Sequence, residues 1–130
     1  MAETKPKILV ADDEQDTLAI FQDILEEDGY QVITASEGQA VLDLLEREKP
    51  NLLILDLRMP RLDGERILHQ ISGRGLMPGM KVIVLTGFSD FGVTRERISR
   101  KFGGLVCDYL EKPIDVSHIK TVVSKRLSDY

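Results

Sequence analysis

Hydrophobic residues in this chain form five short runs, and longer segments between the runs carry an apolar residue every three to four positions. The short runs predict buried strands, and the longer segments predict amphipathic helices. The predicted strands are residues 7–11, 30–35, 52–56, 81–86 and 105–110. Strands that alternate with helices through short connections predict a parallel sheet with right-handed crossovers, which is an α/β fold.

The run that ends at Asp56 is the centre of this pattern. Leu52 to Leu55 are four consecutive apolar residues between Pro50 and Pro60, which is typical of a strand covered on both faces. Asp56 follows where the strand leaves the core. Because an ionised carboxylate is costly to bury without a partner, the sequence predicts a polar site at this strand end.

Local signals set the expected ends of the helices. Asp13, Ser36 and Asp115 are expected to cap the first, second and last helices with their side chains. Gly29 is expected to end the first helix in the left-handed conformation. The expected loops include residues 59–64 and 87–92.

Length and composition narrow the class of protein. A chain of 130 residues, 42% hydrophobic and 30% charged, is expected to form one domain over residues 1–130, with a core over about 6–128. A net charge of −5 argues against direct binding to nucleic acid, and no apolar run approaches a membrane span. The polar N-terminus and the lone Cys107 favour a cytoplasmic location.

Polar residues follow four of the predicted strands. Asp12 and Asp13 lie at the end of the first strand, Asp56 at the end of the third, Thr86 at the end of the fourth and Lys112 at the end of the fifth. In open parallel sheets, ligands bind at the carboxyl ends of the strands, so these residues are expected to converge. Carboxylates this close repel one another unless a cation joins them, and oxygen ligands of this kind suit Mg²⁺.

This set of residues suits phosphoryl transfer, which needs positioning and charge neutralisation more than covalent help. Asp56 is the expected nucleophile, because a carboxylate can form an acyl phosphate. The Lys112 ammonium and the Thr86 hydroxyl can each meet a phosphoryl oxygen. Singly, each residue also has an ordinary structural role: a helix cap, a turn residue, a strand former or a solvated charge. The four strand ends together favour the phosphoryl site.

The motifs ILVADDE, LLILDLRMPRLDG, VIVLTG and DYLEKP resemble those of the receiver domains of two-component response regulators, and the match covers nearly the whole chain. The resemblance implies a flavodoxin-like (βα)5 three-layer sandwich with a parallel five-stranded sheet of order 2-1-3-4-5. It also implies a phosphorylation-activated signalling switch. Such a switch is not an enzyme beyond its own phosphoryl acceptance and autodephosphorylation.

The same resemblance implies roles for particular acids. Asp56 would be phosphorylated by a sensor histidine kinase, a phosphotransfer protein or a small phosphodonor. Asp13 and Asp56 would bind Mg²⁺ directly, and Asp12 would act through water. The backbone carbonyl of Arg58 would be a further metal ligand.

The resemblance further implies how the switch operates. Thr86 and Lys112 would contact the phosphoryl group, and Tyr109 would be the aromatic switch residue that turns inward when Thr86 moves. The Lys112–Pro113 bond would be cis, a state that proline makes accessible. A partner would read the changed surface of the fourth helix, fifth strand and fifth helix. That partner would be a downstream protein or a fused output domain, or a second copy in a phosphorylation-dependent dimer.

Some features depart from the family pattern. The segment from Thr86 to Lys112 is a few residues longer than expected, and Phe88 is hypothesised to cover part of the phosphoryl site and slow hydrolysis. Cys107 is expected in the core. The basic run of the predicted fourth helix is either a solvated face or a docking surface for an acidic partner; its members are Arg95, Arg97, Arg100 and Lys101.

Two other functions stay open from the sequence. One is a phosphotransferase or phosphatase of the aspartyl-phosphate type. Such enzymes usually carry a second Asp two residues after the nucleophile, where this chain has Arg58. The other is a degenerate receiver that acts only as an interaction module, against which the intact Asp13, Asp56, Thr86 and Lys112 argue.

Overall fold

The structure is a computed structural model that describes residues 5–59, 62–74, 79–87 and 91–128. Its helices are α1 (Gln15–Glu27), α2 (Gly38–Glu48), α3 (Gly64–Arg74), α4 (Phe91–Phe102) and α5 (Val116–Leu127). Its strands are β1 (Lys7–Ala11), β2 (Gln31–Ala35), β3 (Leu52–Asp56), β4 (Arg58–Met59), β5 (Leu62–Asp63), β6 (Lys81–Gly87) and β7 (Val106–Lys112). No helix within the described residues is long and apolar enough to cross a membrane.

Five of the strands form one parallel sheet in the order β2-β1-β3-β6-β7. All four pairings in this sheet are parallel, so the carboxyl ends of the strands lie along one edge. Counting only these five strands, the order is the predicted 2-1-3-4-5. The predicted α/β fold, its parallel sheet and its strand order are therefore confirmed.

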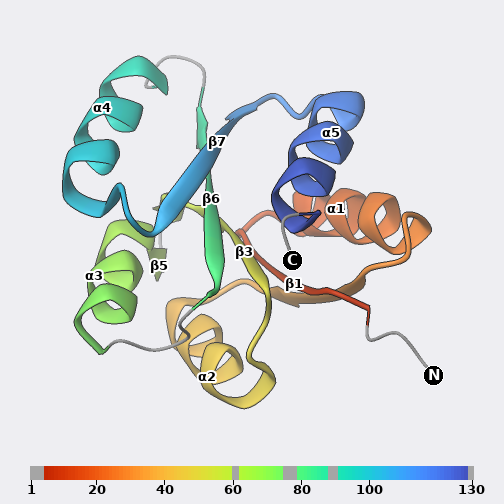
Figure 1. The fold of residues 1–130 in the computed structure, drawn as a ribbon, viewed down its shortest axis with the longest axis horizontal. Coiled ribbons are helices and arrows are strands. Elements are labelled where there is room, and N and C mark those ends of the chain that lie inside the picture. Colours follow the sequence, from red (N-terminus) through yellow and green to blue (C-terminus); the bar gives the residue numbers. More distant parts are fainter. Residues whose placement is uncertain (1–4, 60–61, 75–78, 88–90, 129–130) are drawn as a thin grey trace.

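The helices cover both faces of the sheet (Figure 1), which makes the predicted three layers. One core cluster joins apolar side chains of α2, α3 and α4 to one face of the sheet, and the other joins those of α1 and α5 to the opposite face. On β3, Leu53 and Leu55 belong to the first cluster, and Leu52 and Ile54 to the second. This alternation is the two-residue period of a strand buried on both faces.

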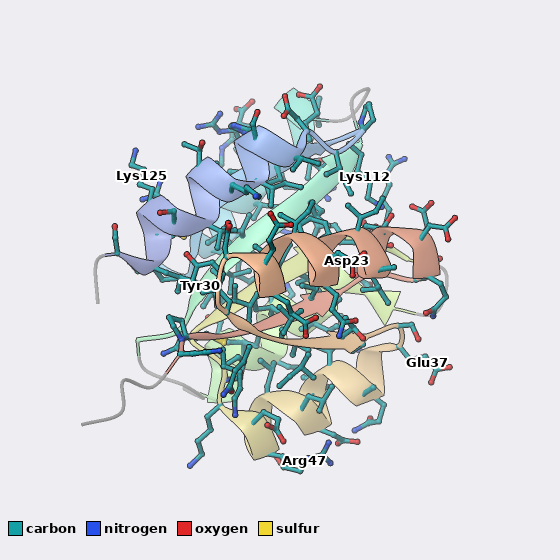
Figure 2. All side chains as sticks on the ribbon, turned by 90° about the vertical axis from the view of Figure 1, so that its right-hand side faces the viewer. Asp23, Tyr30, Glu37, Arg47, Lys112 and Lys125 are labelled. Carbon is teal, nitrogen blue, oxygen red and sulfur yellow. The ribbon has the colours of Figure 1, made fainter. Side chains whose placement is uncertain are left out.

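Helices α1 and α5 lie next to each other on their side of the sheet. Figure 2 shows Asp23 on the outer surface of α1, and Lys112 close to the end where α1 begins. Lys120 of α5 lies 3.7 Å from Glu27 Oε1 and 3.5 Å from Asp28 Oδ1 at the other end of α1. The two helices therefore share an apolar core cluster against the sheet and are linked by ion pairs at the surface.

The expected helix caps are partly right. The Asp115 side chain accepts a hydrogen bond from the His118 backbone N–H and caps α5, and Gly29 after α1 has a φ of +94°. The predictions for Asp13 and Ser36 are wrong, because Glu14 and Glu37 occupy those N-cap positions without a side-chain cap bond. Asp13 instead lies in a cluster of four acidic residues.

The predicted loop over residues 59–64 is wrong in detail. Strands β4 and β5 pair there as a short antiparallel hairpin, with Arg58 opposite Asp63, and α3 begins directly at Gly64. A Cβ on Gly64 would lie 2.7 Å from the Leu57 Cα atom and 2.8 Å from the Asp56 carbonyl oxygen. The chain needs glycine at this position because α3 starts in direct contact with the end of β3.

The predicted loop over residues 87–92 is shorter than expected. Gly87 belongs to β6 and α4 already begins at Phe91, while residues 88–90, including Phe88, lie outside the described residues. On α4, Ile98 is fully buried and Val93 is 74% exposed. Only part of the apolar pattern in this helix therefore faces the core.

Strand β7 carries one irregularity in its pairing with β6. Val82 pairs with Val106, but the next residue, Ile83, pairs with Asp108, so Cys107 is an extra residue on β7. As a result, Val106 and Tyr109 lie on the same face of the sheet although they are three residues apart. The bulge resets the alternation of side chains before the strand reaches Lys112.

Candidate functional site

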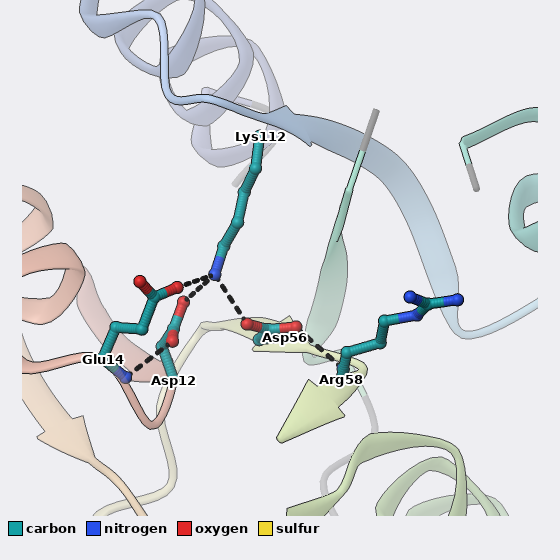
Figure 3. A network of polar contacts seen from close by, with 5 residues as sticks. All are labelled: Asp12, Glu14, Asp56, Arg58 and Lys112. Atoms are coloured by element: carbon teal, nitrogen blue, oxygen red, sulfur yellow. Dashed lines mark hydrogen bonds and ion pairs between the residues drawn. The ribbon is translucent and has the colours of Figure 1, made fainter. Parts of the chain in front are cut away.

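The carboxyl edge of the sheet holds the polar residues that the sequence singled out. Asp12 directly follows β1 and donates its backbone N–H to the Ala35 carbonyl oxygen at 3.1 Å. Asp56 is the last residue of β3, and Lys112 is the last residue of β7. Three strands therefore deliver these side chains to the same place (Figure 3).

The Lys112 ammonium lies among three carboxylates. It donates hydrogen bonds to Asp56 Oδ2 at 2.7 Å and to Glu14 Oε1 at 2.9 Å. Its nitrogen also lies 2.8 Å from Asp12 Oδ2. That third contact is an ion pair to a carboxylate oxygen that is buried from solvent.

Asp56 is held through both of its carboxylate oxygens. Oδ2 faces Lys112, and Oδ1 accepts a hydrogen bond from the Arg58 backbone N–H at 2.8 Å. Only 4% of the residue is exposed. The carboxylate is thus fixed in orientation while it remains at the edge of the sheet.

Burial and charge act in opposite directions on these groups. Burial raises the pKa of Asp12, the contact with Lys112 lowers it, and the net result is a raised pKa. Burial alone would lower the pKa of Lys112, but its contacts with Asp12, Asp56 and Glu14 outweigh burial and raise the pKa above its ordinary value. Lys112 is therefore charged at neutral pH.

The acidic residues beside Lys112 fit a hard divalent cation. Asp12, Asp13, Glu14 and Asp56 can each offer one carboxylate oxygen, and these oxygens lie within 4.8 Å of one another. Oxygen ligands of this kind suit Mg²⁺, which keeps several of its waters.

Thr86 and Tyr109 lie toward the face of the sheet that α4 covers, since Tyr109 and Val84, two residues before Thr86 on β6, belong to the core cluster of that face. Thr86 is 3% exposed and follows Leu85, which pairs with Asp56. Tyr109 is 7% exposed and packs in the cluster that includes α4. Its hydroxyl lies 2.9 Å from Ser99 Oγ, and the Arg95 guanidinium carbon lies 5.4 Å from its ring centroid. Tyr109 therefore points inward, in contact with α4.

The structure also shows a residue to which the sequence gave no role. Glu14, at the start of α1, contacts Lys112 across 98 positions of sequence. Its place directly after Asp12 and Asp13 was the available signal. The Lys112–Pro113 peptide bond is cis, and the hypothesis about Phe88 falls on residues outside the described ranges.

Fold and site together define a class of protein: a parallel α/β domain with a cluster of acidic residues around a lysine at the carboxyl edge of its sheet. The family model described as the response regulator receiver domain matches residues 8–124. The chain belongs to this family.

Two curated relatives differ in how much of their length this chain covers. Sporulation initiation phosphotransferase F of Bacillus subtilis (strain 168) is 30% identical over 121 residues, which are 93% of this chain and 93% of that protein. The alkaline phosphatase synthesis transcriptional regulatory protein PhoP of the same organism is 44% identical over 80 residues, 62% of this chain but 32% of that protein. The chain thus spans one relative almost fully and about a third of the other.

Solved structures agree with the family. The signal receiver domain of a putative Luxo repressor protein from Vibrio parahaemolyticus has a TM-score of 0.83 and 26% sequence identity, over 97% of this chain and 92% of that one. A receiver domain protein from Clostridium thermocellum has a TM-score of 0.80 and 30% identity, over 95% of each chain.

Proposed function

We propose that this receiver domain is a phosphorylation-activated switch in which Asp56 accepts a phosphoryl group from a histidine kinase or a phosphotransfer protein. The observation that carries the proposal is the Asp56 carboxylate itself, held by Lys112 and the Arg58 backbone N–H beside three further acids. Family membership supports phosphorylation-controlled signalling in general. The choice of Asp56 rests on the geometry of this site.

In the proposed step, an Asp56 carboxylate oxygen attacks the phosphorus atom of the donor. A new P–O bond forms, the bond from phosphorus to the donor atom breaks, and the donor leaves with that electron pair. The product is an acyl phosphate. The Lys112 ammonium, already 2.7 Å from Asp56 Oδ2, is close enough to pair with a phosphoryl oxygen, and the Thr86 hydroxyl is proposed to donate to another.

Asp13 and Asp56 are the proposed direct ligands of Mg²⁺, with Asp12 acting through water and the Arg58 backbone carbonyl as a further ligand. When bound, the ion supplies positive charge that offsets the charge on the phosphoryl oxygens. Lys112 of β7 supplies a further positive charge next to Asp56.

Thr86 and Tyr109 are the proposed switch. Tyr109 packs in the core cluster that includes α4, its hydroxyl contacts Ser99 of α4, and Thr86 is two residues after Val84 of the same cluster. A shift of Thr86 toward the phosphoryl group would change the space beside Tyr109, and with it the surface of α4, β7 and α5. This is a population shift between two packings, biased by the added charge.

The proposal is tested with acetyl phosphate and Mg²⁺, followed by mass spectrometry of the intact protein. One added phosphoryl group, removed by hydroxylamine as expected of an acyl phosphate, is the predicted result. Asp56→Asn should abolish the adduct, and Asp23→Asn on the outer surface of α1 should leave it unchanged. An adduct that persists in Asp56→Asn would disprove the choice of Asp56.

One observation favours a second candidate function. The relative that this chain matches along 93% of both lengths is named a phosphotransferase. In that role, the chain would pass its phosphoryl group on to a histidine of another protein. Incubating the phosphorylated chain with a histidine phosphotransfer domain distinguishes the two: rapid loss of phosphate from Asp56 with gain on the partner supports transfer, and retention supports a terminal switch.

A further inference from the structure

The outer surface of α4 is rich in basic residues. A hollow of about 290 Å³ on this surface is lined by Val93, Glu96, Arg97, Arg100 and Lys101. These positions are three or four residues apart, so they share one side of the helix. Three of the five side chains are cationic in a chain whose net charge is −5. Val93 adds an apolar side chain that is 74% exposed at the N-terminal end.

All three cations already contact a carboxylate: Arg100 contacts Glu96 on the same helix, and the other two share Glu65. Glu65 of α3 contacts Arg97 Nη2 through Oε1 at 3.0 Å and accepts a hydrogen bond from Lys101 Nζ through Oε2 at 2.9 Å. Its side chain is 24% exposed, whereas those of Arg97 and Lys101 are 54% and 47% exposed. Arg97 and Lys101 are four residues apart on α4 and together bind one carboxylate.

We propose that this side of α4 is a docking surface for an acidic segment of a partner protein, and that Glu65 is a built-in competitor for it. The partner segment would place a carboxylate between Arg97 and Lys101 and an apolar side chain against Val93. The Glu65 carboxylate shows that these cations can hold such a group. Charge complementarity selects an acidic partner, because the basic side chains project to solvent beyond Glu65.

Glu65 also connects this surface to Asp56. Gly64, directly before Glu65, contacts the Leu57 Cα atom and the Asp56 carbonyl oxygen so closely that a Cβ would overlap both. A displacement of the backbone at Asp56 would therefore move the start of α3 and, with it, the Glu65 carboxylate. This part of the inference rests on the proposed function, since it makes phosphorylation the event that releases Arg97 and Lys101.

The docking surface itself is tested on the unphosphorylated protein, so its failure differs from a failure of the proposed function. The probe is a synthetic helical peptide of about 15 residues with glutamates four positions apart and one leucine. A second peptide with glutamine in place of glutamate is the charge control. Binding is measured by calorimetry at two salt concentrations.

Glu65→Gln should tighten binding of the acidic peptide by about threefold to fivefold, as expected when an exposed ion pair no longer competes. Glu26→Gln on α1 makes the same change in net charge far from α4 and should have no such effect. Arg97→Gln combined with Lys101→Gln should remove binding of the acidic peptide. The glutamine peptide should bind neither the unmodified protein nor Glu65→Gln. Circular dichroism melts establish that each variant is folded.

Several results would overturn the proposal. One is equal tightening in Glu65→Gln and Glu26→Gln, which would make the effect one of net charge alone. Another is unchanged binding when Arg97 and Lys101 are both replaced. A third is concentration-dependent self-association through this surface in sedimentation experiments, which would make a second copy of the chain the occupant.

Discussion

At the scale of single residues, Lys112 determines whether the acidic site is stable without a metal ion. Its ammonium meets Asp12, Glu14 and Asp56 within 2.9 Å. Without it, these carboxylates would repel one another at the carboxyl edge of the sheet. The lysine therefore has a structural role in the resting protein as well as the role proposed for it in phosphorylation.

Replacing Lys112 with methionine is predicted to lower the free energy of unfolding by about 1–2 kcal/mol at pH 7 without Mg²⁺, because three acids lose a partly buried partner. Urea unfolding followed by circular dichroism measures the change. Lys120→Met is the matched control, since Lys120 makes longer contacts at the surface, and its effect should stay within about 0.5 kcal/mol. Equal stability of Lys112→Met and the unmodified protein would contradict the role given to this ion cluster.

Cys107 gives a prediction about pH. Burial raises the pKa of this half-buried thiol, so the neutral form is favoured in the folded protein and the stability this provides is lost as pH rises through the folded pKa. Because the thiolate is the reactive form, alkylation by iodoacetamide should rise at a higher pH in the folded protein than in urea. Identical pH profiles in the two conditions would contradict this assignment.

At the scale of elements, the start of α3 is in close contact with the end of β3. Gly64→Ala should lower the free energy of unfolding by about 1–3 kcal/mol, because the new Cβ would overlap backbone atoms of Asp56 and Leu57. Gly73→Ala is the matched control within the same helix, where a Cβ meets nothing within 4 Å, and it should stabilise by about 0.5–1 kcal/mol. Chemical denaturation of both variants gives the comparison, and a Gly64→Ala variant as stable as Gly73→Ala would refute the close contact.

The elements also show what the sequence could predict. The period of apolar residues gave the five main strands and five helices, because burial on one or both faces dictates that period. It missed the β4–β5 hairpin, since two-residue strands have no period to detect. The prediction that Asp13 caps a helix is wrong because an acid before a helix can be either a cap or a member of an acidic cluster.

Part of the site could also be predicted from the sequence. Asp12, Asp56 and Lys112 converge because parallel strands bring their carboxyl ends to one edge, a rule that depends on topology alone. The role of Glu14 was not predicted because its contact with Lys112 depends on the direction of a side chain just before α1. The contacts of Glu65 with Arg97 and Lys101 of α4 could not be predicted either, since the sequence does not show which faces of the two helices meet.

At the scale of the whole molecule, binding of Mg²⁺ to the acidic cluster should stabilise the fold, since a ligand that binds only the folded state shifts unfolding by mass action. At ten times its dissociation constant, the ion should add about 1.4 kcal/mol to the free energy of unfolding. The chain has no tryptophan, so circular dichroism is the suitable signal. EDTA should reverse the gain.

Asp13→Asn should remove most of this stabilisation by Mg²⁺, because it removes one of the four clustered acids. Asp23→Asn, on the outer surface of α1, should retain it. A full stabilisation in Asp13→Asn would place the ion elsewhere on the molecule.

The bulge at Cys107 has a consequence for how chain length can vary in this protein. Because one residue of β7 is left out of the pairing with β6, the strand can accommodate a change of one residue before Tyr109 by gaining or losing a bulge. Residues 109–112 would keep their register against β6, and the Lys112 ammonium would still reach Asp56. Natural or engineered variants that lose Cys107 altogether should therefore keep the contacts between Lys112 and the acidic residues, with the adjustment confined to the start of the strand.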